Sequence, residues 1–443
     1  MIVTSTPEAS PGTAADIVDR QRTTLFPWVK PYYAEPVVLS EGEGVWVKDV
    51  EGQDYLDFFA GILTTSIGHC HPAVTERVTR QMQRLGHTST LYVTEPQLEV
   101  AQQIIDLAPE GLTRAAFTNS GTEAVETAIM AARVHTGRTE VVALRHAYSG
   151  RSSLATSITA HASWRPLPST SAGIVHARSP YRYRAPLGPD ATDEQLTAFF
   201  IDDLVETIET TTSGRPAALI VESIQGVGGF IVPTEGYLAQ AAEVIRHYGG
   251  LFIADEVQTG FGRTGTHWFG CQHDGVAPDI MVMAKGIANG FPVAATVARE
   301  EVAASWGSLS VSTYGGNPVS MAATAATLDV MVEEDVPTRS ETRGHQLRQA
   351  LEGLQQRFEW IGEVRGRGLM QAMEIVADRT SKTPDAARTR ALMQAAREEH
   401  LLIGAGGLSG HVIRTGPSML ITESETAEAI ARLTRACERA DAL

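Results

Sequence analysis

The sequence predicts an α/β protein in which helices cover a mostly parallel sheet, with a smaller α+β domain beside it. In the middle of the chain, short apolar runs alternate with helical stretches: "EVVAL", "AALIVES", "GLFIADE" and "DIMVMAK". This alternation is typical of successive strand–helix–strand units. From about Val319 the pattern changes to long helices followed by isolated strand-like runs. We therefore expect a large domain over residues 66–319, and a small domain built from residues 1–65 and 320–443.

The elements outside the middle of the chain follow from local patterns. The Thr-, Ser-, Pro- and Ala-rich N-terminus predicts a loose tail up to about Asp16. Residues 42–59, "GEGVWVKDVEGQDYLDFF", predict two short strands around the turn "DVEGQ". Residues 71–85 carry apolar side chains at helical spacing. Near the C-terminus we expect helices over 321–334 and 345–358, strands over 369–376 and 411–416, and a final helix.

Composition limits the classes of partner. The chain of 443 residues has 36 Lys and Arg against 52 Asp and Glu, a net charge of −16. Such an acidic surface disfavours nucleic acid and anionic membranes. No run approaches the roughly 20 apolar residues of a membrane span, and the N-terminus lacks the pattern of a secretory signal. The cysteines, Cys70, Cys271 and Cys437, are far apart, which favours a reducing compartment and, by default, the cytoplasm.

Polar side chains follow three of the predicted strands. "LIVES" ends at Glu222, "LFIADEVQ" carries Asp255, Glu256 and Gln258, and "IMVMAK" ends at Lys285. The carboxyl ends of parallel strands meet at one edge of a sheet, where ligands bind. Each residue alone could be a solvated strand end. Because a buried, unpaired charge is costly, three such ends at one edge favour a site.

A helix N-terminus supplies a second feature. In "FTNSGTEAVETAIMAARVHTG", residues 119–122 precede a helix that we expect to stop near Gly137. Free N–H groups and the positive end of the helix dipole would bind an anion such as phosphate. The alternative is an ordinary helix cap with Glu123 in the first turn.

An anion seat, a buried carboxylate and a lone lysine meet the needs of pyridoxal phosphate, whose aldehyde needs an amine and whose ring nitrogen needs an acidic partner. From about Pro31 to its C-terminus the chain resembles class III (fold type I) aminotransferases. The resemblance rests on "GLFIADEVQTGFGRTG" and "PDIMVMAKGIANGFP", with support from "TNSGTEAVETA", "ESIQGVGGF" and "TYGGNP". It implies a large domain with a mostly parallel seven-stranded sheet. It also implies ping-pong transfer of an amino group, through a Schiff base, to a 2-oxo acid such as pyruvate, glyoxylate or 2-oxoglutarate. The donor would be an alanine-like or ω-amino acid.

The resemblance gives roles to residues around the cofactor ring. Lys285 is similar to the Schiff-base lysine, which also moves the proton, and Asp255 to the partner of the pyridinium nitrogen. Gln258 matches the residue that bonds the phenolic oxygen. Val257 would pack under the ring, and Tyr148 in "HAYSG" would stack on its other face.

Further matches concern the phosphate and the neighbouring subunit. Ser120, Gly121 and Thr122 match the phosphate loop. Thr313 matches a threonine that reaches the phosphate of the neighbouring subunit, which implies a homodimer, or a tetramer built from dimers. Glu222 matches the glutamate of the family's EPxQG segment, although serine stands here in place of the proline.

The resemblance also suggests a substrate pocket. Arg414 in "HVIRTGPSM" is similar to the arginine that binds a substrate carboxylate, for which a planar guanidinium is well suited. Arg151 matches a second carboxylate-binding arginine in some members. Members that take 4-aminobutyrate often carry a glutamate after "QG", where this chain has Val227, so we expect α-carboxylate substrates. Trp28 and Ile62 could line the pocket or belong to the core.

Other interpretations stay open at this point. The same fold hosts racemases, decarboxylases and phospho-lyases, and a non-catalytic binding protein is a further alternative. "GHCHP" could suggest a metal site, but two histidines and one cysteine in a tight turn are more often structural, so we expect no metal. "QGVGGF" lacks the glycine spacing of a dinucleotide-binding loop.

Overall fold

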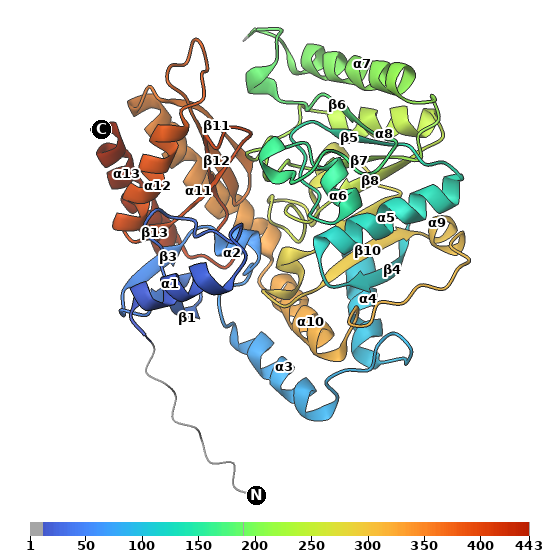
Figure 1. Ribbon diagram of the computed structural model, residues 1–443, viewed down its shortest axis with the longest axis horizontal. Coiled ribbons are helices and arrows are strands. Elements are labelled where there is room, and N and C mark those ends of the chain that lie inside the picture. The colour runs from blue at the N-terminus through green and yellow to red at the C-terminus, as the bar shows by residue number, and fades with distance from the viewer. Residues whose placement is uncertain (1–11, 189, 443) are drawn as a thin grey trace, which may run out of the picture.

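The computed structural model describes residues 12–188 and 190–442. Within these residues the strands form three sheets (Figure 1). The largest has seven strands in the order β4-β10-β9-β8-β7-β5-β6, and two sheets of four strands have the orders β1-β2-β3-β13 and β11-β12-β15-β14. The α/β class with a seven-stranded main sheet is therefore confirmed.

The elements have the following bounds. The strands are β1 Leu39–Glu43, β2 Trp46–Asp49, β3 Asp54–Asp57, β4 Leu112–Thr118, β5 Val141–Leu144, β6 Ile174–Ala177, β7 Ala218–Glu222, β8 Leu251–Asp255, β9 Ile280–Met283, β10 Ala294–Arg299, β11 Ile361–Arg367, β12 Met370–Ile375, β13 Leu401–Leu402, β14 Gly404–Gly406 and β15 Val412–Thr415. The α-helices are α1 Ala14–Thr24, α2 Ala60–Leu63, α3 Pro72–Arg84, α4 Glu95–Leu107, α5 Gly121–Thr136, α6 Ser153–Ile158, α7 Asp193–Thr211, α8 Tyr237–His247, α9 Glu300–Ala304, α10 Pro318–Glu333, α11 Val336–Arg357, α12 Ala386–Glu398 and α13 Glu423–Asp441. Short 3₁₀ turns are η1 Ala162–Trp164, η2 Arg182–Arg184, η3 Gly270–Asp274 and η4 Lys285–Ala288.

The main sheet is mostly parallel. Strands β6, β5, β7, β8 and β9 pair in parallel, whereas β10 runs antiparallel between β9 and β4. Every residue of β5, β7 and β9 is buried, as expected where helices cover both faces of a sheet. The carboxyl ends of β7, β8 and β9 consequently lie side by side at one edge.

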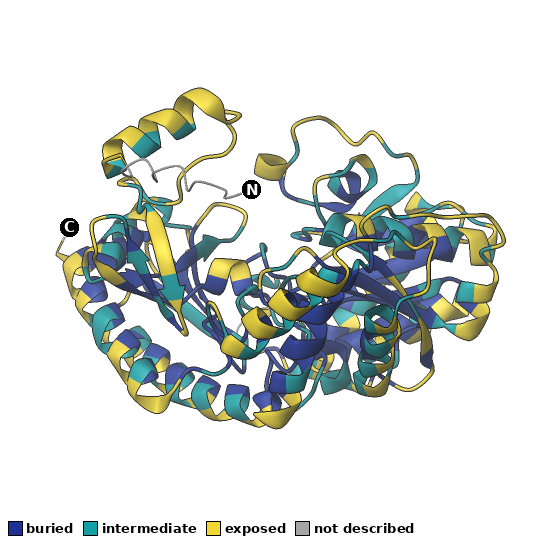
Figure 2. Ribbon diagram, turned by 90° about the horizontal axis from the view of Figure 1, so that it is seen from below, coloured by how far each residue is buried: buried dark blue, intermediate teal, exposed yellow. Residues whose placement is uncertain are grey.

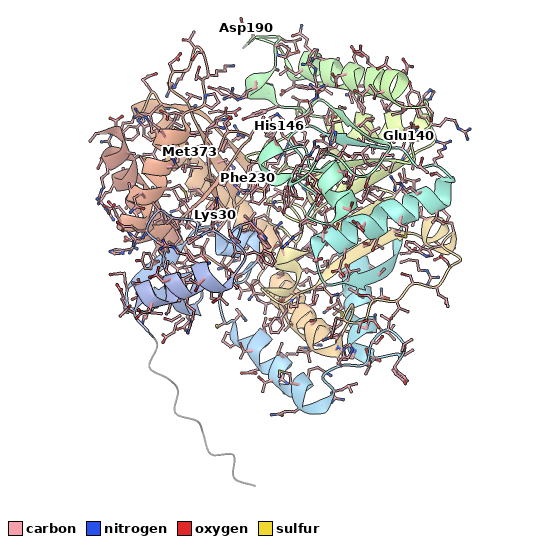
Figure 3. All side chains as sticks on the ribbon, in the orientation of Figure 1. Lys30, Glu140, His146, Asp190, Phe230 and Met373 are labelled. Carbon is pink, nitrogen blue, oxygen red and sulfur yellow. The ribbon has the colours of Figure 1, made fainter. Side chains whose placement is uncertain are left out.

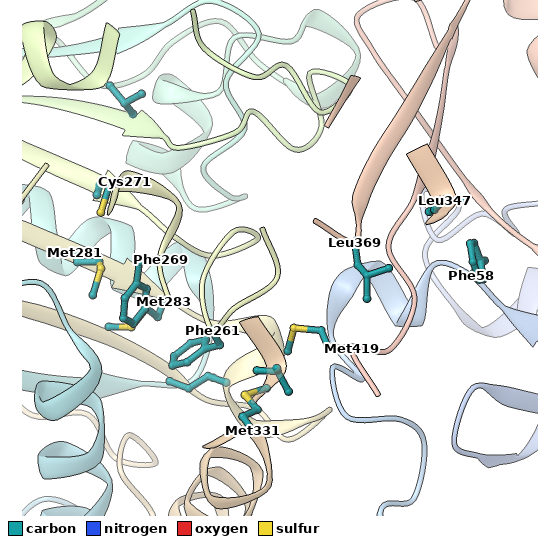
Figure 4. Close-up of a cluster of buried hydrophobic side chains, with 14 of the residues drawn as sticks. Phe58, Phe261, Phe269, Cys271, Met281, Met283, Met331, Leu347, Leu369 and Met419 are labelled. Carbon is teal, nitrogen blue, oxygen red and sulfur yellow. The ribbon is translucent and has the colours of Figure 1, made fainter. Parts of the chain in front are cut away.

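A continuous core joins the sheet to the helices beside it. Met281 and Met283 of β9 pack in one cluster with Phe269, Met331 of α10 and Met419 (Figure 4). In Figure 2 the buried residues concentrate in the strands and on the inner faces of the helices, and the outer helix faces are exposed. Because this core reaches Met419, it also connects the main sheet with the C-terminal part of the chain.

Both ends of the chain build the second half of the molecule. Strand β13 pairs in parallel with β3, so C-terminal residues extend the N-terminal sheet, and Figure 1 shows blue and red elements together on one side. We call the part around the seven-stranded sheet the large domain and the part around the two smaller sheets the small domain. Helix α10 packs on α3, α4 and η4, so the expected boundary after residue 319 falls inside a helix that contacts the large domain.

The N-terminal expectation needs a correction. Helix α1 begins at Ala14, where a loose tail was expected up to Asp16. The reason is a capping box: the Thr13 hydroxyl accepts a bond from the Asp16 N–H, and the Asp16 carboxylate accepts one from Thr13. Residues 1–11 of the expected tail lie outside the described residues. No helix in the described part of the chain combines the length and the apolar character needed to cross a bilayer.

Candidate active site

Three strand ends of the main sheet converge on one cavity. Glu222 ends β7, Asp255 ends β8, and Lys285 follows β9 by two residues. All three line a cavity of about 440 Å³. Strands β7 and β8 are apolar runs that end at their first charged residue, and the apolar run of β9 continues through Ala284 to Lys285. Burial of each run therefore places the charge at the edge of the sheet. The grouping expected from the strand ends is thus present.

The carboxylates and the amine alter one another's protonation. Burial raises the pKa of the Glu222 carboxyl, and the charge of Asp255 raises it further. Burial also raises the pKa of Asp255, although an N–H bond from Val257 and the charge of Lys285 oppose this. Burial lowers the pKa of the Lys285 amine, although the charges of the two carboxylates act in the opposite direction. Such opposed shifts in one cavity are typical of a functional site.

Lys285 also has an unusual backbone. Its φ is +49°, in the left-handed region that residues with a side chain seldom adopt. The residue begins the turn η4, directly after the buried strand β9. Strain of this kind is held in place by the surrounding structure and is concentrated at functional sites.

Helix α5 points its N-terminus at the same cavity. Ser120, Gly121 and Thr122 line the cavity, and the Ser120 hydroxyl does not cap the helix but donates to Glu123 over 2.8 Å. Thr122 Oγ1 lies 2.6 Å from the Ser152 hydroxyl. Glu123 lies in the first turn, as the alternative of an ordinary helix cap expects, but the Ser120 side chain leaves the N–H groups of that turn free to bind an anion.

Tyr148, Val257 and Gln258 complete the wall of the cavity. The Tyr148 N–H donates to Glu222 Oε1 over 2.9 Å, which fixes this aromatic residue beside the carboxylate pair. The Gln258 side chain is buried, and its Oε1 has no partner among the described residues. A buried polar atom without a partner inside a cavity indicates a missing ligand or water.

These residues fit pyridoxal phosphate. The cavity offers an amine for the aldehyde, a carboxylate for the ring nitrogen, an aromatic and an aliphatic wall, and a helix N-terminus for the phosphate. The unpaired Gln258 oxygen adds an unused polar group at the same place. Four further cavities in the described part of the chain have no lysine among their lining residues.

Comparison with known proteins agrees with this geometry. The family model "Aminotransferase class-III" matches residues 29–437. The chain belongs to the class III aminotransferases. It is 38% identical over 422 residues to alanine–glyoxylate aminotransferase 2 homolog 2, mitochondrial, of Arabidopsis thaliana, covering 95% of this chain and 87% of that protein. It is 39% identical over 404 residues to acetylornithine aminotransferase of Methanopyrus kandleri, covering 91% and 94% of the two chains.

Solved structures resemble the aminotransferase as well. A thermostable (S)-enantioselective ω-transaminase from Thermomicrobium roseum has a TM-score of 0.89 at 34% identity, covering 97% of this chain and 99% of the other. Similar structures include an amine transaminase in its PLP-bound form. The protein is a pyridoxal-phosphate-dependent aminotransferase of fold type I, which sets aside the racemase, decarboxylase, lyase and non-catalytic alternatives.

Arg414 of the aminotransferase is not among the residues that line the cavity. Its guanidinium is buried between the rings of Phe59 and Phe230, 5.1 Å and 5.4 Å from their centroids. It donates to the carbonyl oxygens of Ala405 and Gly226, the latter over 3.0 Å. Gly226 in turn donates to Glu222, so one backbone group separates Arg414 from the cavity wall.

Four more of the expected residues lie inside the cavity, near it or away from it. Arg151 lines the cavity, and its guanidinium lies 4.4 Å from the centre of the Trp28 ring, which brings Trp28 to the mouth. Ile62 is exposed and has a φ of +67°, an outlier for a β-branched side chain, two residues before Thr64 of the cavity wall. Thr313 lies in a different hollow and is exposed to solvent.

Several lining residues were not expected from the sequence. They include Thr64, Gly150, Ile224 and the run 290–293. The run 290–293 continues the "AKGIANGFP" stretch that contains Lys285, so its proximity was a usable signal. Thr64 carries no such signal, because the fold of the small domain brings it to the cavity.

Proposed function

We propose that Lys285 is the catalytic amine of this aminotransferase and Asp255 its acidic partner. When bound, pyridoxal phosphate supplies the carbonyl that accepts the amino group and a ring that withdraws electrons. The lowered pKa of Lys285 keeps more of its Nζ unprotonated near neutral pH, so that it can act as a nucleophile and as a base at the substrate α-carbon. The convergence of Lys285, Asp255 and Glu222 on one cavity supports this proposal most strongly.

The remaining cavity residues would hold the cofactor in place. Thr122 and the first N–H groups of α5 would bind the phosphate, together with Ser120 and Gly121. Tyr148 and Val257 would enclose the ring, and Gln258, whose oxygen has no partner among the described residues, would bind a polar group of the ring. The Asp255 carboxylate is oriented by a 3.1 Å bond from the Val257 N–H.

The substrate is an amino acid whose α-carboxylate pairs with Arg414. Nη1 and Nη2 of Arg414 each donate one hydrogen bond to a carbonyl oxygen, and the Tyr32 hydroxyl lies within hydrogen-bonding reach of the same guanidinium. Its hydrogen-bond partners among the described residues are the carbonyl oxygens of Ala405 and Gly226, so we infer that its charge is available for a substrate carboxylate. Val227 stands where a neutralising glutamate would be needed.

Alanine is therefore the proposed donor class, with pyruvate or glyoxylate as the acceptor. Arg151 would bind the distal carboxylate of 2-oxoglutarate, with Trp28 and Ile62 near the entrance. The test is a comparison of kcat/KM for L-alanine and 4-aminobutyrate with one acceptor. We expect alanine to be favoured, and an advantage of 4-aminobutyrate of more than about tenfold would contradict the proposal, because about 1.4 kcal/mol would then favour the distal amine.

The active unit is proposed to be a homodimer, in which Thr313 reaches the phosphate of the neighbouring subunit. Large apolar side chains are exposed close to it, namely Leu91, Tyr92, Val93, Val311 and Tyr314. Exposed apolar patches of this kind are typical of protein interfaces. Light scattering at low protein concentration tests this, and a monomer with full activity would contradict it.

A further inference from the structure

A buried ion-pair cluster crosses the junction between the two domains, outside the cofactor cavity. Its centre is Glu374 of β12, whose side chain is fully buried. Glu374 accepts bonds from Arg365 Nη1 over 2.6 Å, from Arg184 Nε over 2.7 Å and from the Tyr181 hydroxyl. His411 Nε2 lies 3.3 Å away. Tyr181 and Arg184 belong to the large domain and the other three residues to the small domain, so one carboxylate ties the domains together.

The same cluster also holds the loop that follows β7. Arg365 Nε donates to the Gly229 carbonyl over 2.8 Å. Gly229 has a φ of +105°, and a Cβ there would collide with Val412 and Arg365. The loop therefore packs closely against the small domain, and no other residue type would fit at this point without a shift.

This loop connects the cluster to the active site. Gly226, three residues before Gly229, donates to Glu222 over 2.8 Å and accepts from Arg414 over 3.0 Å. Phe230, at the end of the loop, packs against the Arg414 guanidinium and lies between the two halves of the molecule in Figure 3. The position of Arg414 relative to the cavity is thus set through backbone contacts of this loop.

The small-domain sheet supplies a second connection. Strand β12 pairs antiparallel with β15, with Glu374 opposite Val412 and Ala372 opposite Arg414. Glu374 and the Arg414 position are therefore two pairs apart in one rigid ladder. A displacement of Glu374 from its large-domain partners would move β15 and Arg414 with it.

Loss of the Glu374 charge would remove the carboxylate partner of Arg184 and one of the two carboxylate partners of Arg365. Burial alone would raise the pKa of the Glu374 carboxyl, but the bond with His411 and the charges of Arg365 and Arg184 hold it well below its usual range. Arg365 is itself buried and would keep its charge without Glu374, with Glu363 as its remaining partner. Removal of one partner from a buried pair is more disruptive than removal of both, so a shift of the junction is the expected response.

We propose that Glu374, with its partner Tyr181, is a positioning residue that fixes Arg414 at the distance from the cofactor cavity that a substrate carboxylate requires. The proposal rests on the proposed role of Arg414 in carboxylate binding. It makes Glu374 a determinant of affinity for amino acids and 2-oxo acids, without contact with either substrate or cofactor.

The test uses the holoenzyme and the absorbance change of its cofactor on mixing with L-alanine, measured without any 2-oxo acid. Glu374→Gln should weaken the apparent affinity for alanine by about tenfold, the order found for residues coupled through contacts, with the saturating rate changed less than about threefold. Tyr181→Phe, which removes one hydroxyl and keeps the packing, should weaken it about twofold to threefold. The rate with hydroxylamine, which reaches the cofactor and has no carboxylate, should stay the same in both variants.

Asp279→Asn serves as the matched control. Asp279 is a buried carboxylate paired with Arg246 and Arg299 at the opposite end of β9, so its loss tests general destabilisation. It should leave the affinity for alanine unchanged. Equal effects of Glu374→Gln and Asp279→Asn, or an equal loss with hydroxylamine, would overturn the proposal.

Arg414→Gln separates this proposal from the one on which it rests. If Arg414→Gln leaves the alanine affinity unchanged, the proposed role of Arg414 is wrong. If Arg414→Gln weakens alanine binding while Glu374→Gln and Tyr181→Phe do not, only the positioning role is wrong. Cofactor content, measured by absorbance after denaturation, shows that each variant is folded and loaded.

Discussion

Glu222 and Asp255 occupy paired positions on two neighbouring parallel strands, as the last residues of β7 and β8. Both carboxyl groups are buried, and burial is the largest cause of their raised pKa values. Two carboxylates held this close oppose each other's ionisation unless a positive group lies between them. The pair therefore stores an unfavourable interaction that Lys285 and a protonated cofactor ring would relieve.

The first prediction concerns the stability of the cofactor-free protein. A carboxyl whose native pKa is raised costs nothing below its ordinary value near 4.5, where it is protonated in both states. Between that value and the raised native value, the unfolded state ionises while the buried group keeps its proton, so stability falls as the pH rises, and the loss is complete above the native pKa. We therefore compare the free energy of unfolding of Glu222→Gln with that of the wild type. The difference in favour of the variant should be larger at pH 8 than at pH 4.5 by roughly 2 kcal/mol.

Urea unfolding of the cofactor-free protein at several pH values checks this. The Lys285 amine is common to both proteins, so the difference between them isolates the carboxylate. Glu359→Gln, which changes an exposed carboxylate, is the control and should follow the wild-type profile. Parallel profiles for the wild type and Glu222→Gln would show that the pair carries no strain.

The second prediction concerns Lys285. Lys285→Ala should lower turnover by about 10²- to 10⁴-fold or more, because the cavity offers no second amine to move the proton. Steady-state rates with alanine and pyruvate give the measurement. Lys48→Ala, at an exposed lysine of β2, should keep full activity. Turnover near the wild-type level in Lys285→Ala would require another catalytic base.

The third prediction concerns the two arginines. Arg414→Gln should raise KM for alanine and for pyruvate by about 10- to 100-fold, the loss expected when a charged partner of a carboxylate is removed. Arg151→Gln should raise KM for 2-oxoglutarate and leave KM for pyruvate near its original value, because pyruvate has no distal carboxylate. If Arg151→Gln instead raised KM for pyruvate and Arg414→Gln affected only 2-oxoglutarate, the roles proposed for the two arginines would have to be exchanged.

The fourth prediction tests the absence of a neutralising carboxylate. Val227→Glu should place an acid in the loop whose Gly226 carbonyl accepts from Arg414, and thereby reduce the free charge of that guanidinium. The ratio of kcat/KM for 4-aminobutyrate to that for alanine should rise about tenfold or more. Val227→Gln introduces a side chain of the same size as glutamate but without its charge, and it should leave the ratio unchanged. If the glutamine variant shifts the ratio equally, size and not charge is responsible.

Much of the fold was predictable because strands that are buried on both faces are apolar runs in the sequence. The runs that form β5, β7, β8 and β9 were all recognised, as was the helix α5 with its stop at Gly137. The antiparallel strand β10 was not, since its alanine-rich sequence has little β-propensity and owes its conformation to the strands on either side. The capping box that starts α1 is a local signal carried by Thr13 and Asp16.

The candidate site was predictable where strand ends carry the chemistry. The cavity brings together Lys285, Asp255, Glu222 and the start of α5, as expected. The carbonyl oxygens that bind Arg414 and the ion-pair cluster around Glu374 were not predictable, because both depend on how the two domains pack against each other. Their residues come from segments far apart in the chain and have no shared pattern. The cytoplasmic location and the residue roles stay predictions.

The most direct test of the account is the visible absorption spectrum of the purified enzyme before and after addition of L-alanine, with no 2-oxo acid present. We predict that the band of the lysine-bound cofactor disappears, that the band of the aminated cofactor replaces it, and that pyruvate alone restores the first. A cofactor band that alanine leaves unchanged would contradict an alanine-type donor. The absence of any cofactor band, even after pyridoxal phosphate is supplied, would contradict the assignment of the cavity around Lys285.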